Sequence, residues 1–480
     1  MKRSLVIAAF SLLMGSNAFA QSWVYTGSMF GERRHHVTHT LRTGKVLVAG
    51  GTDQVQVSLR TCELYDPATG EWTQSSPMSV ARERHTLNEL EDGRLVIIGG
   101  NAGSTSGNQL TGSIEIYDPA SDTWSEVASL RHARQNHASV LMQDGRILVI
   151  GGYTGDVTAS CEIYDPVTNT VGFSDSNHVG VASLNVPRHE PQAALLNNGE
   201  VIVIGGRGHD YLRSTEIYNP TTNSWREVGD MNQPRTIGSL IVFKDGTVLT
   251  TGGRKSSNLI APGAEVFDLN SETWKEIEPL HQARHWQGNV LMPNNRYLIT
   301  GGYYDGDLST NSVVDCTPIC EWYNKDNETW YYAPQLNLQR GQHGAVYFKH
   351  FNGAKLKENV IVTGGIIEDY QITNTCEILD VTEEAINTYM LNQPKSEVIP
   401  VVPNGLRDQV VITNDGGDMI LGSKLDHAEY TIMSATGQIL NSGSLEGSTL
   451  LNLSKLDLAS GLYFIQIRTG SHAFVIKVML

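Results

Sequence analysis

Short apolar runs recur along the chain, and each of them ends in a pair of glycines. The runs include KVLVAGG, RLVIIGG and RILVIGG. Each run is too short and too rich in β-branched residues for a helix, and turn-forming pairs such as Asp92-Gly93 and Asp144-Gly145 precede several of them. The pattern therefore predicts paired strands. The seven glycine pairs are Gly50-Gly51, Gly99-Gly100, Gly151-Gly152, Gly205-Gly206, Gly252-Gly253, Gly301-Gly302 and Gly364-Gly365.

A second segment of fixed order follows each glycine pair after a polar loop. It reads Glu, an apolar residue, usually an aromatic residue, and then Asp or Asn, as in ELYDP and EIYNP. Seven positions beyond the aromatic residue stands Trp72, Trp124, Trp225, Trp274 or Trp330 in five of the units. Units of four short antiparallel strands, repeated about every 50 residues, indicate a β-propeller in which each blade buries its faces against its neighbours. We expect an all-β, seven-bladed propeller.

The last unit lacks a tryptophan strand of its own. It runs through Cys376 to Asp380 and continues as VTEEAINTYM, whereas Trp23 opens the segment WVYTGSM with no blade before it. We expect the N-terminal segment to supply the outer strand of the seventh blade, because this pairing removes an exposed sheet edge and ties down both ends. The alternative is that residues Ile386 to Met390 form that strand.

The two ends of the chain differ from the repeats. Two basic residues precede an apolar stretch from Leu5 to Met14, and the small residues Ala18 and Ala20 follow, which is typical of an export signal that is removed. No later stretch reaches the ~20 apolar residues of a membrane span, so no transmembrane segment is expected in the mature chain. We assign residues 1–20 to the signal, 21–390 to the propeller, 391–400 to a linker and 401–480 to a small C-terminal β-sandwich.

Charge and cysteine positions limit the partners and the cross-links. The 480 residues include 51 acidic and 35 basic ones, for a net charge of −16. Nucleic-acid affinity depends on clustered Lys and Arg, so no nucleic-acid partner is expected.

Four of the five cysteines each precede the repeated Glu, namely Cys62, Cys161, Cys320 and Cys376. This places them in the same small buried position of four different blades, too far apart for disulfides. Only Cys316 with Cys320 is a plausible local pair.

These motifs resemble those of the kelch family. The glycine pair, the following Tyr-Asp and the spaced Trp are that family's blade signature, and the phrases DGRILVIGG and EIYDPASDTW are similar to its secreted, galactose-oxidase-like branch. The stretches TIMSATGQIL and LDLASGLYFIQI, with Lys477, resemble the C-terminal sorting domain of the type IX secretion system. That resemblance implies a Gram-negative relative of the Bacteroidetes, contact with the type IX machinery, and release or attachment at the outer cell surface. An ordinary small β-sandwich is the alternative.

Two further positions repeat at the start of each blade. Four residues after the Met or Leu that ends the tryptophan strand stands an Arg, and three residues later four of the units carry a His. A site is rarely sevenfold, so we interpret the arginines as packing devices that bond neighbouring carbonyls. Strand side chains project toward adjacent blades, so no metal centre is expected from the histidines. The arginines are Arg33, Arg82, Arg134, Arg188, Arg235, Arg284 and Arg340, and the histidines are His36, His85, His137 and His343.

The two positions between the repeated Arg and the repeated His vary from blade to blade. They lie where the innermost strands enter the ring, on the same face as the loops that follow the glycine pairs. Variation within a repeated frame, on loops held by a rigid scaffold, is typical of recognition, and the aromatic residues offer faces for sugar rings or side chains. The candidate ligand-binding residues are Arg34, His35, Glu83, Arg84, His189, Glu190, Tyr211, His285, Trp286 and Tyr303.

Two functions fit this organisation. The first is a non-catalytic, secreted or surface-displayed module that binds a carbohydrate or protein ligand through its loop face and needs no cofactor. The second is a carbohydrate-active enzyme, because the kelch resemblance includes a copper-radical galactose oxidase and a sialic-acid epimerase. The oxidase requires a Tyr followed directly by His, which the sequence lacks. An epimerase requires an acid or base beside a cation, which Glu190 with Arg188 and His189, or Glu83 with Arg84, could provide. Without a recognisable catalytic set, the binding function is favoured.

Overall fold

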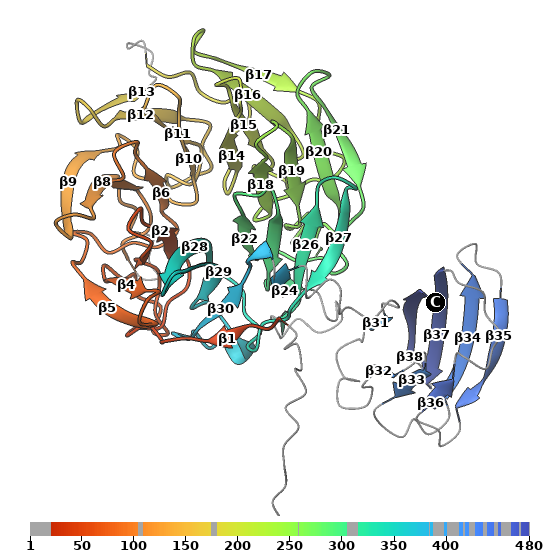
Figure 1. The fold of residues 1–480 in the computed structure, drawn as a ribbon. Helices are drawn as coiled ribbons and strands as arrows, with labels where there is room; N and C mark the ends of the chain where they lie inside the picture. Colours follow the sequence, from red (N-terminus) through yellow and green to blue (C-terminus); the bar gives the residue numbers. More distant parts are fainter. Residues whose placement is uncertain are drawn as a thin grey trace, which may run out of the picture.

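Seven four-stranded antiparallel sheets are arranged around a central axis, as the blades of a propeller (Figure 1). The computed structural model describes residues 21–383 with gaps at 104–108, 174–179, 258 and 305–314, residues 385–386, and the strands of the segment 398–479. The expected all-β, seven-bladed propeller is confirmed. The expected export signal lies outside the described residues, as do residues 391–397 of the expected linker.

The strands follow the predicted spacing, four to a blade. The innermost strands are β2 (Val37–Thr40), β6 (Thr86–Glu89), β10 (Ala138–Leu141), β14 (Gln192–Leu195), β18 (Ser239–Val242), β22 (Gly288–Leu291) and β28 (Gly344–Asn352). The second strands are β3 (Val46–Ala49), β7 (Leu95–Ile98), β11 (Ile147–Ile150), β15 (Val201–Ile204), β19 (Val248–Thr251), β23 (Tyr297–Thr300) and β29 (Lys355–Thr363). The third strands are β4 (Cys62–Asp66), β8 (Ser113–Asp118), β12 (Cys161–Asp165), β16 (Thr215–Asn219), β20 (Ala264–Asp268), β26 (Cys320–Asn324) and β30 (Cys376–Asp380). The outer strands are β5 (Glu71–Ser75), β9 (Thr123–Ser129), β13 (Thr170–Phe173), β17 (Ser224–Val228), β21 (Thr273–Ile277), β27 (Thr329–Ala333) and β1 (Val24–Tyr25).

A few elements lie outside this frame. A short pair, β24 (Tyr303–Tyr304) with β25 (Asp315–Cys316), and the 3-10 helix η1 (Glu368–Tyr370) follow two of the glycine pairs. The C-terminal segment forms one sheet in the order β31-β38-β37-β34-β35 and another in the order β32-β33-β36. Its strands are β31 (Val398–Pro400), β32 (Ile412–Asp415), β33 (Asp418–Leu421), β34 (Ala428–Ser434), β35 (Ile439–Leu445), β36 (Leu450–Asn452), β37 (Leu462–Thr469) and β38 (His472–Met479). Among the described residues, no helix has the length and apolar character needed to cross a bilayer.

The hydrophobic core lies between neighbouring blades. The second strand of the first six blades is buried throughout, because both faces of each sheet are covered by the next sheet. One core cluster, for example, joins Ala49 and Cys62 of the first blade to Leu95, Ile97 and Tyr117 of the second. The continuous apolar runs of the sequence are therefore explained by burial on both faces.

The N-terminal segment closes the ring. Strand β1 pairs with β30, with Val24 opposite Ile378, and so completes the sheet of the seventh blade. Trp23 is 2% exposed, and its indole Nε1 donates to the carbonyl oxygen of Pro334 at 2.8 Å, as Trp330 Nε1 does to Glu278 O at 3.0 Å one blade earlier. The predicted closure is confirmed. The alternative placed this strand at residues 386–390. It is contradicted at Ile386, whose N–H donates to the carbonyl oxygen of Thr382 within a short turn. Residues 387–390 lie outside the described part of the chain.

The five cysteines are all free and buried, so the plausible Cys316–Cys320 pair does not form. The two thiols pack in different clusters, because Cys316 lies with Tyr303 and Ile366 near the axis and Cys320 lies in the core between blades. The prediction that the other four occupy small buried positions is confirmed.

Thiol reagents are expected to leave the native protein unlabelled. Burial raises the pKa of each of the five cysteines to about 12, so the reactive thiolate is scarce at neutral pH as well as inaccessible. Titration with a chromogenic disulfide reagent at pH 8 should detect no thiol before denaturation and all five after it. Rapid labelling of even one native cysteine would contradict the buried packing.

Candidate ligand-binding site

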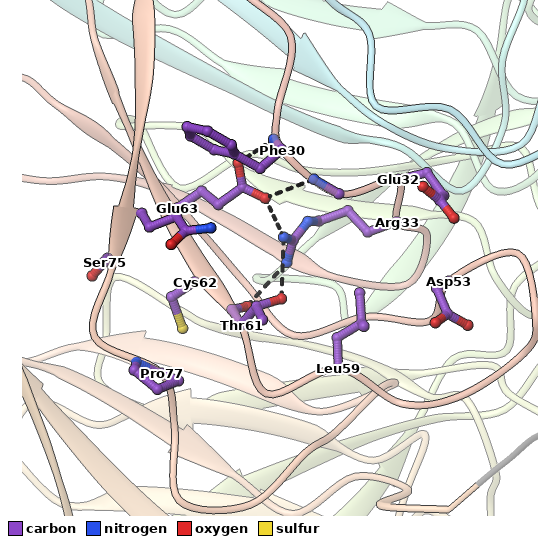
Figure 2. Close-up of a pocket in the computed structure, with 12 residues that line it drawn as sticks. Phe30, Glu32, Arg33, Asp53, Leu59, Thr61, Cys62, Glu63, Ser75 and Pro77 are labelled. Atoms are coloured by element: carbon purple, nitrogen blue, oxygen red, sulfur yellow. Dashed lines mark hydrogen bonds and ion pairs between the residues drawn. The ribbon is translucent and has the colours of Figure 1, made fainter.

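The seven repeated arginines build the frame that carries the site. Each is at most 1% exposed. In the first blade, Arg33 donates from Nη1 to the carbonyl oxygens of Gly50 (2.9 Å) and Thr61 (3.0 Å), and from Nη2 to Glu63 Oε1 (2.5 Å). Figure 2 shows Arg33 with Thr61 and Glu63. These residues line a cavity of about 410 Å³. The interpretation of the arginines as packing devices is confirmed, because the same bonds to the glycine-pair carbonyl recur in every blade.

The glutamate partner of each arginine is the feature that the sequence analysis missed. Glu63 also accepts the backbone N–H groups of Phe30 (2.6 Å) and Gly31 (3.2 Å), so one carboxylate holds both the arginine and the segment that enters the blade. The signal was present, since a Glu begins the ELYD-type segment in all seven units. The carboxylates are Glu63, Glu115, Glu162, Glu216, Glu265, Glu321 and Glu377.

The repeated histidines pack between blades. Nε2 of His137 lies 3.1 Å from Thr86 Oγ1 of the preceding blade, and burial lowers the pKa of His137 to about 3. A Cβ added at Gly99 would lie 2.9 Å from the His137 ring, which explains the glycine at that position together with its φ of +62°. Within the described part of the chain, no group of three or more His, Cys, Asp or Glu side chains is placed to hold a metal ion.

The second variable position of every blade lies in a ring at the mouth of the propeller. All seven residues have a left-handed backbone, with φ between 50° and 57°, and backbone hydrogen bonds connect neighbours around the axis. We call this ring the collar; its members are His35, Arg84, Asn136, Glu190, Ile237, Trp286 and Gln342. In each bond the N–H of the first residue donates to the carbonyl oxygen of the second. The pairs are His35 to Gln342 (3.4 Å), Arg84 to His35 (3.4 Å), Asn136 to Arg84 (3.1 Å), Glu190 to Asn136 (2.9 Å), Trp286 to Ile237 (3.3 Å) and Gln342 to Trp286 (3.0 Å).

The first variable position of each blade forms a bridge with the residue that follows the glycine pair. These bridges tie the collar to the loops on the same face, and they include Arg34 with Thr52, Glu83 with Asn101, His189 with Arg207, and His285 with Tyr303. Nine of the ten candidate residues are thereby brought to one mouth. Tyr211 lies further out, in the loop that bridges back to Arg207, and the Arg207 guanidinium stands 5.6 Å from its ring centre.

A buried carboxylate organises the polar part of the mouth. Glu83 accepts from Asn101 Nδ2 (3.2 Å) and the Thr52 hydroxyl, and its Oε2 lies 3.2 Å from His35 Nδ1. Burial raises the pKa of Glu83, but the His35 hydrogen bond and the Arg84 charge outweigh it and lower that pKa to about 2. Burial lowers the pKa of His35 to about 4. At neutral pH an ionised Glu83 therefore accepts the Nδ1–H of a neutral His35, which leaves His35 Nε2 as an acceptor.

Other polar candidates are also held by hydrogen bonds across the ring. Arg34 Nη1 donates to Gln342 Oε1 at 3.2 Å, and the Thr236 hydroxyl donates to Glu190 Oε2 at 3.1 Å. His189 Nε2 lies 2.9 Å from Asn136 Nδ2. Burial lowers the pKa of His189, so this imidazole is neutral and accepts from the amide. The polar groups of the mouth are thus fixed in orientation before any ligand arrives.

Aromatic side chains make up the other part of the mouth. The ring of Trp286 is half-buried and lies 5.9 Å from His35, 5.0 Å from His285 and 5.5 Å from Tyr303, measured between ring centres. Tyr303 is only 3% exposed and lies under Gly341, so it supports Trp286 instead of presenting a face of its own. His285 and Glu83 are buried as well.

Two family models match the chain. The kelch motif matches residues 33–79, 92–131, 136–171 and 191–232, and a model described as a secretion system C-terminal sorting domain matches residues 400–480. Among solved structures, a fungal alcohol oxidase of the AA5 family in complex with copper superposes with a TM-score of 0.60, over 96% of this chain and 100% of the oxidase chain, at 14% identity. At that identity the similarity concerns the fold alone.

Curated proteins similar to this chain include kelch-like proteins and a scruin of animals. Kelch-like protein 25 of Xenopus tropicalis is 28% identical over 40% of this chain and 32% of its own length. Kelch-like protein 21 of Homo sapiens is 27% identical over 46% of this chain and 41% of its own length, and alpha-scruin of Limulus polyphemus is 26% identical over 50% and 27%. This chain thus spans less than half the length of these relatives.

The two parts of the chain now have separate assignments. The seven closed blades, their glycine pairs and the matching motifs identify the first part, and the match at residues 400–480 identifies the second. A sorting domain of this kind indicates export to the cell surface or the extracellular space. The chain is a kelch-repeat β-propeller that carries a C-terminal sorting domain of the type IX secretion system.

Proposed function

We propose that the propeller is a non-catalytic binding module whose collar holds a carbohydrate or an exposed protein loop outside the cell. The observation that supports this function is the collar itself, because it brings a variable side chain from each of seven blades to one mouth on a rigid frame. Arg34, His35 and Arg84 supply directional polar contacts, and the half-exposed Trp286 supplies an apolar face. This combination suits a ligand that has both hydroxyl or amide groups and an apolar side.

Replacement of Trp286 by alanine is expected to weaken ligand binding by about 2 kcal/mol, as for a central aromatic anchor. It should lower the melting temperature only slightly, because Trp286 packs at the edge of a small buried cluster. The test first screens a panel of host and bacterial glycans for binding to the mature chain. Each glycan that binds is then measured by isothermal titration calorimetry. Phe30→Ala is the matched control, because Phe30 is an exposed aromatic residue on the same face that is not part of the collar. Equal losses in both variants would contradict binding at the collar.

A carbohydrate-active enzyme is the second candidate, and the His35–Glu83 pair favours it. A neutral imidazole held by a buried carboxylate can act as a general base. The relevant comparison is product formation from reducing sugars by the natural protein and by Glu83→Gln and Glu190→Gln. If the natural protein forms product and either substitution abolishes that product formation, the protein is an enzyme and the proposed non-catalytic function is wrong.

A copper oxidase is not supported by the residues present. The AA5 neighbour holds copper, but the described residues of this chain offer no cluster of three or more His, Cys, Asp or Glu side chains for a metal. Four of the five cysteines are buried at the start of third strands, away from the axis, and the fifth, Cys316, is buried beside Tyr303. No step of the proposed function therefore passes through a metal.

A further inference from the structure

A second cavity, of about 570 Å³, lies at the sixth blade on the face opposite the collar. Its walls come from β26 and the turn between β26 and β27, from the turns between β18 and β19 and between β22 and β23, and from the residues that follow β30. These connections lie at the opposite end of the strands from the collar, because neighbouring strands are antiparallel. We call it the blade-6 cavity.

Trp322 departs from the repeat at this cavity. The equivalent position of the third strand is aliphatic in the six other blades, as Leu64, Ile116, Ile163, Ile217, Val266 and Ile378 show. Trp322 is 5% exposed, lines the cavity, and its indole Nε1 has no hydrogen-bond partner. A buried donor left unpaired costs about 1–3 kcal/mol, and an aliphatic residue would avoid that cost.

Arg296 departs from the repeat in the same place. In the second and third blades the corresponding arginine pairs with the aspartate two residues earlier, as in Arg94 with Asp92 (2.7 Å) and Arg146 with Asp144 (2.6 Å). In the sixth blade Asn294 replaces that aspartate. Nη1 of Arg296 is buried without a partner, and Arg296 lines the cavity. Two departures in one blade thus leave two N–H donors unpaired at one cavity.

The charges around the cavity select the class of ligand. Arg296 and Lys325 face three carboxylates, Asp245, Asp326 and Glu383, and Lys325 already pairs with Asp245. An anionic ligand would meet excess negative charge, and a cation would meet Arg296. A neutral hydroxyl group satisfies both sides, because it accepts from Arg296 or Trp322 and donates to a carboxylate.

We propose that the blade-6 cavity binds a short neutral saccharide. The partly buried ring of Tyr331 provides an apolar face on which a pyranose packs, and the edge of the buried Trp322 forms the wall beside it. Arg296 and the carboxylates of Asp326 and Glu383 bond the hydroxyl groups of the sugar. The volume lies within the range of small-molecule sites. This site is independent of the collar.

The test uses the mature full-length chain and calorimetric titration with cellobiose, maltose, laminaribiose and lactose, with glucuronate as an anionic probe. At least one disaccharide is expected to bind, and Trp322→Phe and Arg296→Met are each expected to weaken that binding tenfold or more. Trp322→Phe keeps an aromatic ring in the core and removes the unpaired donor together with part of the indole, so its melting temperature should fall only slightly. Arg94→Met, at the equivalent position of the second blade, should bind as the natural protein does.

Three results would overturn the proposal: no neutral disaccharide binds, glucuronate binds more tightly than every disaccharide, or neither Trp322→Phe nor Arg296→Met weakens binding. Trp286→Ala separates the two sites. Loss of disaccharide binding in Trp286→Ala, with full binding in both blade-6 variants, would place the sugar at the collar and leave the function proposed there intact. Failure of collar ligands to bind would not affect the blade-6 result.

Discussion

Replacement of Arg134 by leucine is expected to lower the free energy of unfolding by about 3–5 kcal/mol, because it leaves a buried carboxylate without its cation. Arg134 and Glu162 are both fully buried, with Nη2 and Oε1 2.7 Å apart. Arg134 also donates to the carbonyl oxygens of Gly151 and Ser160, each at 2.8 Å. Glu162 would retain the backbone N–H groups of Arg131 and His132 and the imidazole of His132, whose Nδ1 lies 3.7 Å from Oε1. Urea denaturation followed by tryptophan fluorescence measures the loss.

Two comparisons make this result specific. Arg146→Ala removes an exposed ion pair with Asp144 in the same blade and should change stability by at most about 1 kcal/mol. The double variant Arg134→Leu with Glu162→Leu removes both charges and should recover part of the loss, because no uncompensated charge stays buried. If Arg134→Leu were as mild as Arg146→Ala, the repeated pairs would not be the frame of the blades.

Replacement of Trp23 by alanine is expected to cost about 3–5 kcal/mol and to open the seventh blade first. The side chain fills the space between the sixth and seventh blades with Leu336, Val381 and Ile386, and its indole N–H is bonded to Pro334 O. Its loss leaves a cavity next to the shortest strand of the ring, the two-residue β1. The expected measurement is a lower urea midpoint together with faster hydrogen exchange in β30.

The exposed neighbour of Trp23 is the matched control. Val24 is the next residue along the chain and the first of β1, and it is 56% exposed, so Val24→Ala should change stability by no more than about 0.5 kcal/mol. If hydrogen exchange in Trp23→Ala accelerates equally in all seven blades, the propeller unfolds as one unit and β1 is no weaker than the other outer strands.

Most of the propeller could be predicted from the sequence because its signals are local. The glycine pair, the apolar run before it and the Glu-x-aromatic segment after it lie within one blade, and each blade repeats them. The closing strand was also predictable, since Trp23 stands in the same sequence context as Trp72. The place of Cys316 was less predictable, because this cysteine lies in the short β24–β25 pair and not at the repeated position of a third strand.

The candidate site was predictable in place but not in detail. The variable positions between the repeated Arg and His do meet at one mouth. Their left-handed backbone, the burial of Tyr303 and Glu83, and the orientation of His35 by Glu83 were not visible in the sequence. Each of these depends on a residue of a neighbouring blade or of the loop after a glycine pair, which lies far away along the chain.

The sequence by itself determined the number of blades, the strands within each blade and the identity of the segment that completes the last one. These follow from hydrophobic patterning and turn residues, which act over a few neighbouring positions. Only the tertiary structure decided which variable residues face the mouth, which lie beneath it, and where donors stay unpaired, as at Trp322 and Arg296. The physical reason is that burial and hydrogen bonding at a position between blades are set by side chains that another repeat supplies.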